Sequence, residues 1–393
     1  MLQQLSQNQI DTIRVWYLVQ HSLSSFYKII RHYGSAAAAF QARHDWAQLN
    51  LHASHLKRVQ EFEQSSAQTT FETLLSLIEQ HSDFIVCLDD ADYPQQLNPY
   101  SDKPPILFGQ GDVSILNAAQ IAMVGSRKPS PQGRQIAYDF AYYLSEKGFY
   151  INSGLALGID EAAHRGGLAN RRSLAVMGTG LDSTYPQQHL QLRQQLIAQG
   201  GAVITEFLPK TPPLQHHFPR RNRIVSGLSL GVIVAEATLQ SGSLITAKIA
   251  AEQGKHIFAI PGHIYDAYHQ GCHLLIREGA TLVDHPEQVI EDLALATTWQ
   301  HQQRSKTISN SKTTCKVDSA ILQQTEANLL CTTLPEHLAA LYAALDWQGQ
   351  DLDQLCLQLG CDAANLTGQL MELELLGLAI QQSGLYLRCG SMQ

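Results

Sequence analysis

The sequence predicts a doubly wound α/β domain with a mostly parallel sheet, and two observations support this. From Ile121 to about Leu295, short apolar runs alternate with helix-like segments, which is typical of strand–helix–strand units with right-handed crossovers. Most of these runs end in glycine, serine or other small residues. In a parallel sheet such ends share one rim, where ligands bind. The 393 residues also leave room for two or three domains.

We expect a short strand at 84–88, an edge strand at 106–109, and seven strands in the alternating region. Proline and glycine punctuate the turns between them. The seven strands are predicted at 121–124, 150–153, 174–177, 203–207, 232–235, 257–260 and 281–283. Helices are expected after Pro131, Gly158, Pro186, Pro219, Gly242, Gly271 and Pro286.

Residues 1–82 are predicted to be helical. A first helix contains Trp16, and a second covers 26–33 and ends at Gly34, a residue suited to the left-handed position after a helix. The turn at 30–34 has two interpretations. It is either a helix-hairpin-helix turn that offers backbone amides to DNA or, more commonly, a turn that only packs two helices together.

The end of the chain has a different character. Residues 297–328 are polar and form a predicted linker. Helices at 335–345 and 352–359, a third helix ending at Leu376 and a hairpin over 383–384 then follow the order of a winged helix. The third helix offers DNA no cation, since it presents Asn365, Gln369, Glu372 and Glu374. Phosphate contacts dominate DNA affinity, so we expect this module to contact protein instead.

Composition narrows the class of protein. With 44% apolar and 16% charged residues, the chain is predicted to be globular rather than disordered. The seven cysteines are scattered, with no Cys-x-x-Cys pair, which favours a reduced, cytoplasmic protein without a zinc knuckle. No secretory signal or membrane-length apolar stretch is expected. The net charge of −8 disfavours nucleic-acid binding by the chain as a whole, so a binding site would have to be a locally basic segment.

One predicted anion site lies between the strand at 121–124 and the helix that begins at Pro131. Gly125 and Ser126 form a tight turn before a helix N-terminus, and Arg127 and Lys128 add charge. The turn matches neither Gly-x-Gly-x-x-Gly nor a P-loop. An ordinary β–α turn is therefore an equally good interpretation.

A second signal is the cationic passage at 216–223, which contains no acid. Arginines bind phosphates and an aromatic face stacks a base, as single-strand binding requires. Alternatively, the arginines pair with carboxylates elsewhere. The candidate DNA contacts here are Phe218, Arg220, Arg221, Asn222 and Arg223; Ser241, Gly242, Ser243, Thr246 and Lys248 provide further donors after the strand at 232–235.

No catalytic nucleophile–base pair stands out. Glu206 and Glu236, at strand ends, are the best catalytic candidates, or they pair with the arginines. His263, His269 and His273 suggest a metal, but no Cys pair or His-Glu-x-x-His motif accompanies them. We therefore expect no metal and no cofactor.

Several motifs together resemble one known family. They are Val-Gly-Ser-Arg (124–127), Ser-Gly-Leu-Ala-Leu-Gly-Ile-Asp-Glu-Ala-Ala-His (153–164), Gly-Thr-Gly-Leu-Asp-Ser-Thr-Tyr-Pro (178–186), Phe-Pro-Arg-Arg-Asn-Arg-Ile-Val (218–225), Glu-Ala (236–237), Ser-Gly-Ser-Leu-Ile-Thr-Ala (241–247), Ile-Pro-Gly (260–262) and Leu-Ile-Arg-Glu-Gly-Ala (275–280). This set is similar to the bacterial DNA-processing protein A (DprA/Smf) family. The resemblance implies a SAM-like helical domain (1–82), an extended Rossmann domain (83–296), a linker (297–328) and a winged-helix domain (329–393).

The resemblance also implies a function. Members bind single-stranded DNA as homodimers and load RecA onto DNA that enters during natural transformation, with no established catalytic activity. The family's DNA pocket maps onto Gly125, Ser126, Arg127, Phe218, Arg221, Asn222, Arg223 and the Ser-Gly-Ser turn. Where some members carry a DNA-contacting lysine, this chain has Gln187, Gln188 and His189. That subsite is expected to be weaker, or supplied by Lys210 or Lys248.

The alternative function is that of a nucleotide-processing enzyme similar to the lysine-decarboxylase-like phosphoribohydrolases. Those enzymes need a Pro-Gly-Gly-x-Gly-Thr-x-x-Glu loop, and the nearest segment, 241–248, has one glycine and no acid. For the DNA-binding hypothesis we expect about five neutralised phosphates. Single-strand affinity should then fall about a hundredfold between roughly 50 and 200 mM salt.

Overall fold

The computed structural model describes residues 5–294, 336–345, 350–375, 379–382 and 385–388. Its contacts divide the chain into two compact units, 1–306 and 307–393. In the described part of the chain, no helix combines the length and the apolar character needed to cross a membrane.

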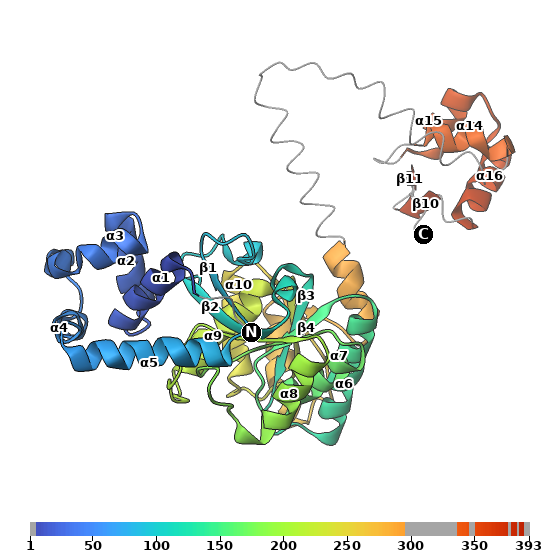
Figure 1. Cartoon of the computed structure of the whole chain (residues 1–393). Helices are drawn as coiled ribbons and strands as arrows, with labels where there is room; N and C mark the ends of the chain where they lie inside the picture. The colour runs from blue at the N-terminus through green and yellow to red at the C-terminus, as the bar shows by residue number, and fades with distance from the viewer. Residues whose placement is uncertain (1–4, 295–335, 346–349, 376–378, 383–384, 389–393) are drawn as a thin grey trace, which may run out of the picture. The chain divides into compact units, whose positions relative to one another are not determined.

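The first unit begins with a group of helices, as predicted (Figure 1). Serine side chains define their starts: Ser6 forms a capping box with Gln9, and Ser22 accepts a hydrogen bond from the Ser25 amide. Gly34 ends α2 at φ 82°, which confirms the predicted left-handed glycine. The elements are α1 (Gln7–Leu18), α2 (Leu23–Tyr33), α3 (Ala36–Gln41), a 3₁₀ turn (Arg43–Leu49), α4 (Ala53–Glu61) and α5 (Ser65–His81).

A nine-stranded sheet follows, in the order β1-β2-β6-β5-β4-β3-β7-β8-β9. The pairs β1–β2 and β2–β6 are antiparallel and all others are parallel, so the predicted doubly wound, mostly parallel sheet is confirmed. The strands are β1 (Phe84–Cys87), β2 (Ile106–Gly111), β3 (Gln120–Gly125), β4 (Tyr150–Ser153), β5 (Ser173–Val176), β6 (Ala202–Thr205), β7 (Gly231–Glu236), β8 (His256–Ala259) and β9 (Thr281–Leu282).

The prediction of an edge strand at 106–109 is wrong. β2 pairs on both sides, with β1 and with β6, and β1 takes the edge. Ile106, Leu107 and Phe108 are all buried. Three consecutive apolar residues are typical of a strand covered on both faces.

Helices connect the strands at the predicted places. They are α6 (Pro131–Glu146), α7 (Ile159–Ala169), α8 (Leu190–Ala198), α9 (His217–Leu228), α10 (Ser243–Glu252) and α11 (Gln270–Arg277). Short 3₁₀ turns lie at Gln95–Leu97, Val113–Asn117, Gln187–His189 and Ala267–His269. A last helix starts at Pro286 and is described as far as residue 294.

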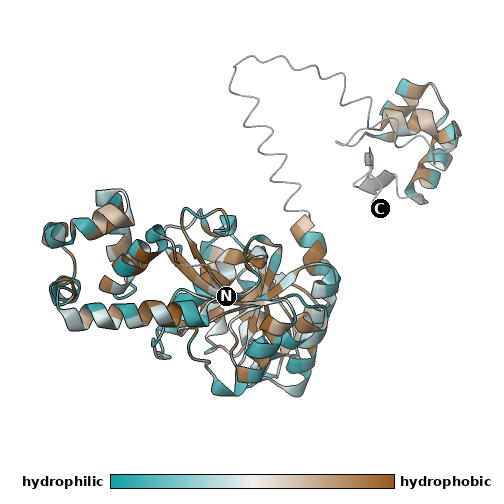
Figure 2. Ribbon diagram, in the orientation of Figure 1, coloured by the Kyte–Doolittle hydropathy of each residue, from teal (hydrophilic) through white to brown (hydrophobic). Residues whose placement is uncertain are grey.

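The apolar residues of this unit gather on the strands, which are brown at its centre in Figure 2. The N-terminal helices share a core with one part of the sheet, because Trp16 and Phe26 belong to the same buried cluster as Phe108 and Val203. The Trp16 indole also donates a hydrogen bond to the Glu206 carbonyl at 2.9 Å. These helices are therefore anchored to the sheet near the end of β6.

The second unit has the predicted winged-helix order. Three helices, α14 (Glu336–Ala344), α15 (Leu352–Leu359) and α16 (Ala363–Leu375), precede the antiparallel pair β10 (Ala379–Gln382) and β11 (Leu385–Arg388). Leucines of the three helices form its core. The predicted turn at 383–384 and the linker at 297–328 lie outside the described residues.

Candidate nucleic-acid interface

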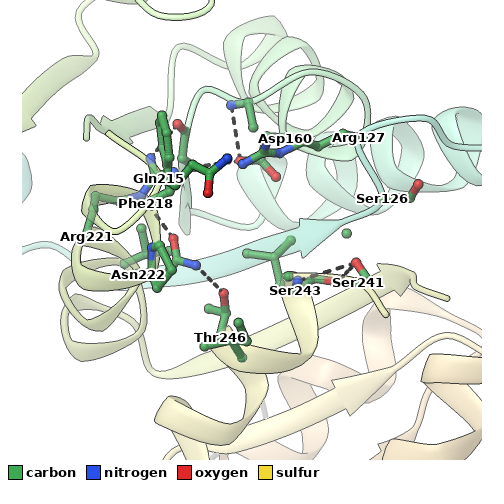
Figure 3. A pocket seen from close by; sticks show the side chains of 18 of the residues that line it. Ser126, Arg127, Asp160, Gln215, Phe218, Arg221, Asn222, Ser241, Ser243 and Thr246 are labelled. Carbon is green, nitrogen blue, oxygen red and sulfur yellow. Dashed lines mark hydrogen bonds between the residues drawn. The ribbon is translucent and has the colours of Figure 1, made fainter. Parts of the chain in front are cut away.

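A cavity of about 660 Å³ lies where β3, β7 and the first turns of α9 and α10 meet (Figure 3). Three segments that are distant in the sequence, 125–128, 218–222 and 241–246, come together here. Eleven of the predicted binding residues line it: Gly125, Ser126, Arg127, Lys128, Phe218, Arg221, Asn222, Ser241, Gly242, Ser243 and Thr246.

An aromatic wall with a cation beside it bounds the cavity. The Phe218 ring lies 5.4 Å from the Tyr185 ring, centroid to centroid, and the Arg127 guanidinium carbon lies 5.5 Å from the Phe218 centroid. Tyr185 is 46% exposed, and Arg127 and Lys128 are also exposed. Neither cation has a hydrogen-bond or ion-pair partner for its side chain among the described residues. This wall offers a stacking surface and two uncommitted positive charges.

Arg221 forms part of the cavity floor. Its buried guanidinium donates to the carbonyls of Gly154 and Val176, and burial lowers the pKa of Arg221 to about 10. The nearby Asp160 accepts hydrogen bonds from the amides of Gly154 and Ala156 at 3.1 and 3.2 Å, while burial raises the pKa of its carboxyl. The charge of Arg221 is therefore balanced by Asp160, and Arg221 shapes the site more than it adds net charge.

The N-terminus of α6 is not a free anion site, so here the structure favours the second interpretation of residues 121–134, an ordinary β–α turn. Buried Glu236 accepts hydrogen bonds from the amide and hydroxyl of Ser130, the latter at 2.6 Å. Ser130 in turn caps the Gly133 amide. A Cβ at Gly133 would lie 2.1 Å from the Glu236 carboxylate, so only glycine fits. Glu236 thus holds the positive end of this helix.

The start of α10 presents two hydroxyl groups to the cavity. The Ser243 amide donates a hydrogen bond of 3.4 Å to the Ser241 hydroxyl, and the Leu244 and Ile245 amides donate to the Ser241 and Gly242 carbonyls. The Ser241 and Ser243 hydroxyls lie 2.6 Å apart. Asn222 donates to Thr246 at 2.8 Å and so ties α9 to α10. A Cβ at Gly242 would meet nothing within 4 Å. The space over Gly242 is therefore left for a ligand.

Two of the three arginines in the cationic passage do not face the cavity, which corrects the sequence interpretation. Fully buried Glu206 binds Arg220 through two hydrogen bonds of 3.0 and 2.9 Å, and Arg223 through one of 2.6 Å. The alternative of pairing with a carboxylate thus holds for both. Lys248 is exposed on α10 but does not line the cavity either.

Glu206 and Glu236, the two catalytic candidates, are both engaged within the fold: Glu206 pairs with arginines and Glu236 accepts from Ser130. Neither lines the cavity. Of the three histidines considered for a metal, His273 accepts the Gly262 amide and contacts its carbonyl. Within the described residues, no group of three or more His, Cys, Asp or Glu is arranged to hold a metal ion. Buried His189 contacts the Leu155 carbonyl and Glu161 rather than the cavity.

Sequence reasoning missed Tyr185 as a wall of the site. Its signal was an aromatic residue in the loop that follows β5 and the Gly-Thr-Gly turn at 178–180, directly before the Pro186 that marked the next helix.

Comparison with known proteins assigns the family. The model of DNA recombination-mediator protein A matches residues 84–294, and that of the DprA winged-helix domain matches 329–384. The chain belongs to the DprA/Smf family. Protein Smf of Synechocystis is 32% identical over 315 residues, which cover 76% of this chain and 78% of that protein.

Two further relatives match over shorter stretches of this chain. The Escherichia coli protein Smf is 43% identical over 62% of this chain, and the match spans 65% of its own length. DprA of Streptococcus pneumoniae is 46% identical over 52% of this chain and 72% of its own. The crystal structure of the S. pneumoniae protein matches with a TM-score of 0.62 and 34% identity, over 72% of this chain and 97% of that one. A Helicobacter pylori DprA structure, described by its single-stranded DNA binding mode, matches with a TM-score of 0.50 and 29% identity, over 55% of this chain and 98% of that one.

Proposed function

We propose that this protein binds single-stranded DNA in the cavity at the sheet rim and passes the strand to the recombinase RecA, without cleaving a bond. The observation that carries the proposal is the arrangement around one cavity of Arg127 and Lys128, the Phe218–Tyr185 wall, and the unobstructed Gly242 with its two flanking serine hydroxyls. Cations bind phosphates, and an aromatic face stacks any base. The related H. pylori protein, described as a single-stranded DNA binder, supports the substrate class.

The residues that line the first cavity also favour DNA binding without catalysis. Asp160 is the sole carboxylate among the described lining residues. Two backbone amides engage it, so it is not free to act as a general base. Three further parts of the proposal are supported by membership of the DprA/Smf family. They are delivery of the strand to RecA, action in natural transformation and a cytoplasmic location.

A homodimer formed by the central domain is part of the proposal. Many of the large apolar side chains that are exposed in this domain lie between 239 and 282: Leu239, Ile245, Ile264, Tyr265, Tyr268 and Leu282. Ile245 also lines the cavity. A contact through this region would therefore bring two DNA sites near each other.

Substitution of Gly242 tests the site directly. Gly242→Ala meets no protein atom, so stability should hold within about 1 kcal/mol, whereas a methyl group in the phosphate's place should lower single-strand affinity roughly tenfold. Fluorescence anisotropy with a labelled oligonucleotide measures this. Gly368→Ala, on exposed α16, is the matched control. Equal binding by both variants and the wild type would contradict the proposed pocket.

Delivery to RecA needs a separate assay. The wild-type protein should let RecA form filaments on DNA already covered by single-strand-binding protein, and Gly242→Ala should do so poorly. If the protein binds single strands but has no effect on RecA, the mediator part of the proposal fails while the DNA site stands.

A further inference from the structure

A second cavity, of about 550 Å³, lies between the N-terminal helices and the segment that leaves β6. The end of α1, one residue of α4 and two of α5 form one side. Residues 208–212, 214, 216 and 217 form the other. The motifs and the first cavity do not account for this space.

The second cavity is cationic. No Asp or Glu lines it, whereas Arg58 and Lys210 do. The Arg58 guanidinium carbon lies 4.1 Å from the Tyr17 ring centroid, and its buried Nε has no hydrogen-bond partner in the described residues. A buried guanidinium nitrogen without an acceptor is costly, so the protein around Arg58 leaves part of its hydrogen-bonding capacity unused.

Lys210 is held at the cavity by its backbone. It adopts φ 63°, and its amide donates a hydrogen bond of 2.9 Å to Asp182. Its side chain is exposed and, among the described residues, unpaired. The position therefore presents a free ammonium group at a fixed point of the chain.

The other titratable groups that line the cavity do not cancel this charge, and Asp182, which accepts the Lys210 amide, does not line it. His21 accepts the Leu208 amide at 3.3 Å, and burial, with Arg220, His217 and Arg58 nearby, lowers the pKa of His21 to about 3, so it stays neutral. Burial also lowers the pKa of His217. Arg220 is paired with Glu206. His216 is exposed at the rim.

The two cavities share a wall. Pro213, Gln215 and Phe218 line the first cavity. Pro212, Leu214, His216 and His217, in the same segment, line the second. Adjacent residues are only about 3.8 Å apart between Cα atoms. A polymer that leaves the first cavity over this segment reaches the second without crossing the protein core.

We propose that the second cavity is a further subsite for the same single strand, in which Arg58 and Lys210 bind phosphates of nucleotides that extend beyond the first cavity. The inference rests on the proposed function. It predicts that binding depends on strand length. An oligonucleotide of about six residues occupies the first cavity alone, and one of about 16 reaches both, within the range of site sizes for single-strand binders.

The test compares salt dependence for the two lengths. Each neutralised phosphate contributes about 0.7 to the slope of log affinity against log salt, so the double variant Arg58→Met, Lys210→Asn should lower the slope by about 1.4 on the long strand and leave it unchanged on the short one. Methionine keeps apolar packing on Tyr17, and asparagine tolerates the left-handed backbone of residue 210. Lys57→Ala is the control: its side chain is 76% exposed on α4, and it does not line the cavity.

Each other outcome has a defined meaning. If the double variant has the wild-type slope on the long strand, the second cavity does not bind DNA phosphates and the inference is overturned. The cavity would then suit a different acidic ligand, such as a protein segment. An equal loss on both strands, or the same loss with Lys57→Ala, would also overturn it, because the effect would then be general electrostatics. If neither length binds the wild-type protein, the proposed function itself fails. A thermal melt of the double variant within a few degrees of wild type shows that the fold is intact.

Discussion

Replacing Arg127 by alanine tests how much of the DNA affinity comes from free charge. Arg221 lines the first cavity but is balanced by Asp160, and Arg220 and Arg223 lie outside the lining and are bound to Glu206. Only Arg127 and Lys128 remain uncommitted among the cations of its described lining. A six-residue oligonucleotide should therefore release counterions from about two phosphates, rather than from the five that the sequence suggests.

The magnitude follows from the slope. Two phosphates give a slope of about −1.4, so affinity should fall about sevenfold between roughly 50 and 200 mM salt. Arg127→Ala should halve the slope to about −0.7, which leaves a two- to threefold fall over the same range. Loss of the cation from the Phe218 ring should also weaken binding at every salt concentration.

The assay is anisotropy of a labelled short oligonucleotide at four or more salt concentrations, with Lys147→Ala as the control. Lys147 is exposed at the far end of α6, roughly 24 Å along the helix from the cavity end. A wild-type slope near −3.5 would refute the reasoning, because it would require Arg220 and Arg223 to leave Glu206. An unchanged slope in Arg127→Ala would refute the placement of the strand.

Three further predictions concern stability and the tail. Glu206→Gln should destabilise the protein by about 3–5 kcal/mol in chemical denaturation, because it leaves buried Arg223 with only the exposed and more distant Asp102, at 3.9 Å, as a counter-charge. Glu61→Gln, exposed on α4, should change little. Acid should also destabilise the fold, because burial lowers the folded-state pKa of His21 and His164 to about 3. Their contribution to the free energy of unfolding is intact above about pH 6.5, and each histidine costs about 2 kcal/mol by about pH 5. Denaturation of His164→Gln at about pH 7 and about pH 5 should show a smaller difference in the free energy of unfolding than the wild-type protein shows. Removal of residues 297–393 should leave short-strand affinity within about twofold, because one arginine faces seven acids from residue 335 onward; a tenfold loss would assign DNA contact to the winged helix.

The sequence predicted the fold well because its signals are local. Apolar runs, glycine turns and capping residues specify β3, α6 and the left-handed Gly34 without knowledge of distant neighbours. The position of β2 was missed because strand order depends on pairing across the sheet. A short apolar run does not reveal whether a strand has a neighbour on one edge or on both, and β2 lies between β1 and β6.

The site was predicted only in part for the same reason. The passage at 216–223 contains no acid, which favoured free arginines, yet Arg220 and Arg223 are paired with Glu206, the residue directly after β6. The cap of Glu236 on Ser130 likewise joins residues 106 positions apart. Charge counted along a sequence window does not detect a counter-ion that folding supplies from elsewhere.

The bond from the Trp16 indole to Glu206 has a practical consequence for shortened forms of the protein. Arg220 lies over the Trp16 ring, with 5.5 Å between its guanidinium carbon and the centroid. A version that starts at residue 83 would open the Glu206 cluster to water and bare the Phe207 side chain, which is now fully covered. Such a fragment would be prone to aggregation, and weak DNA binding by it would say little about the intact molecule.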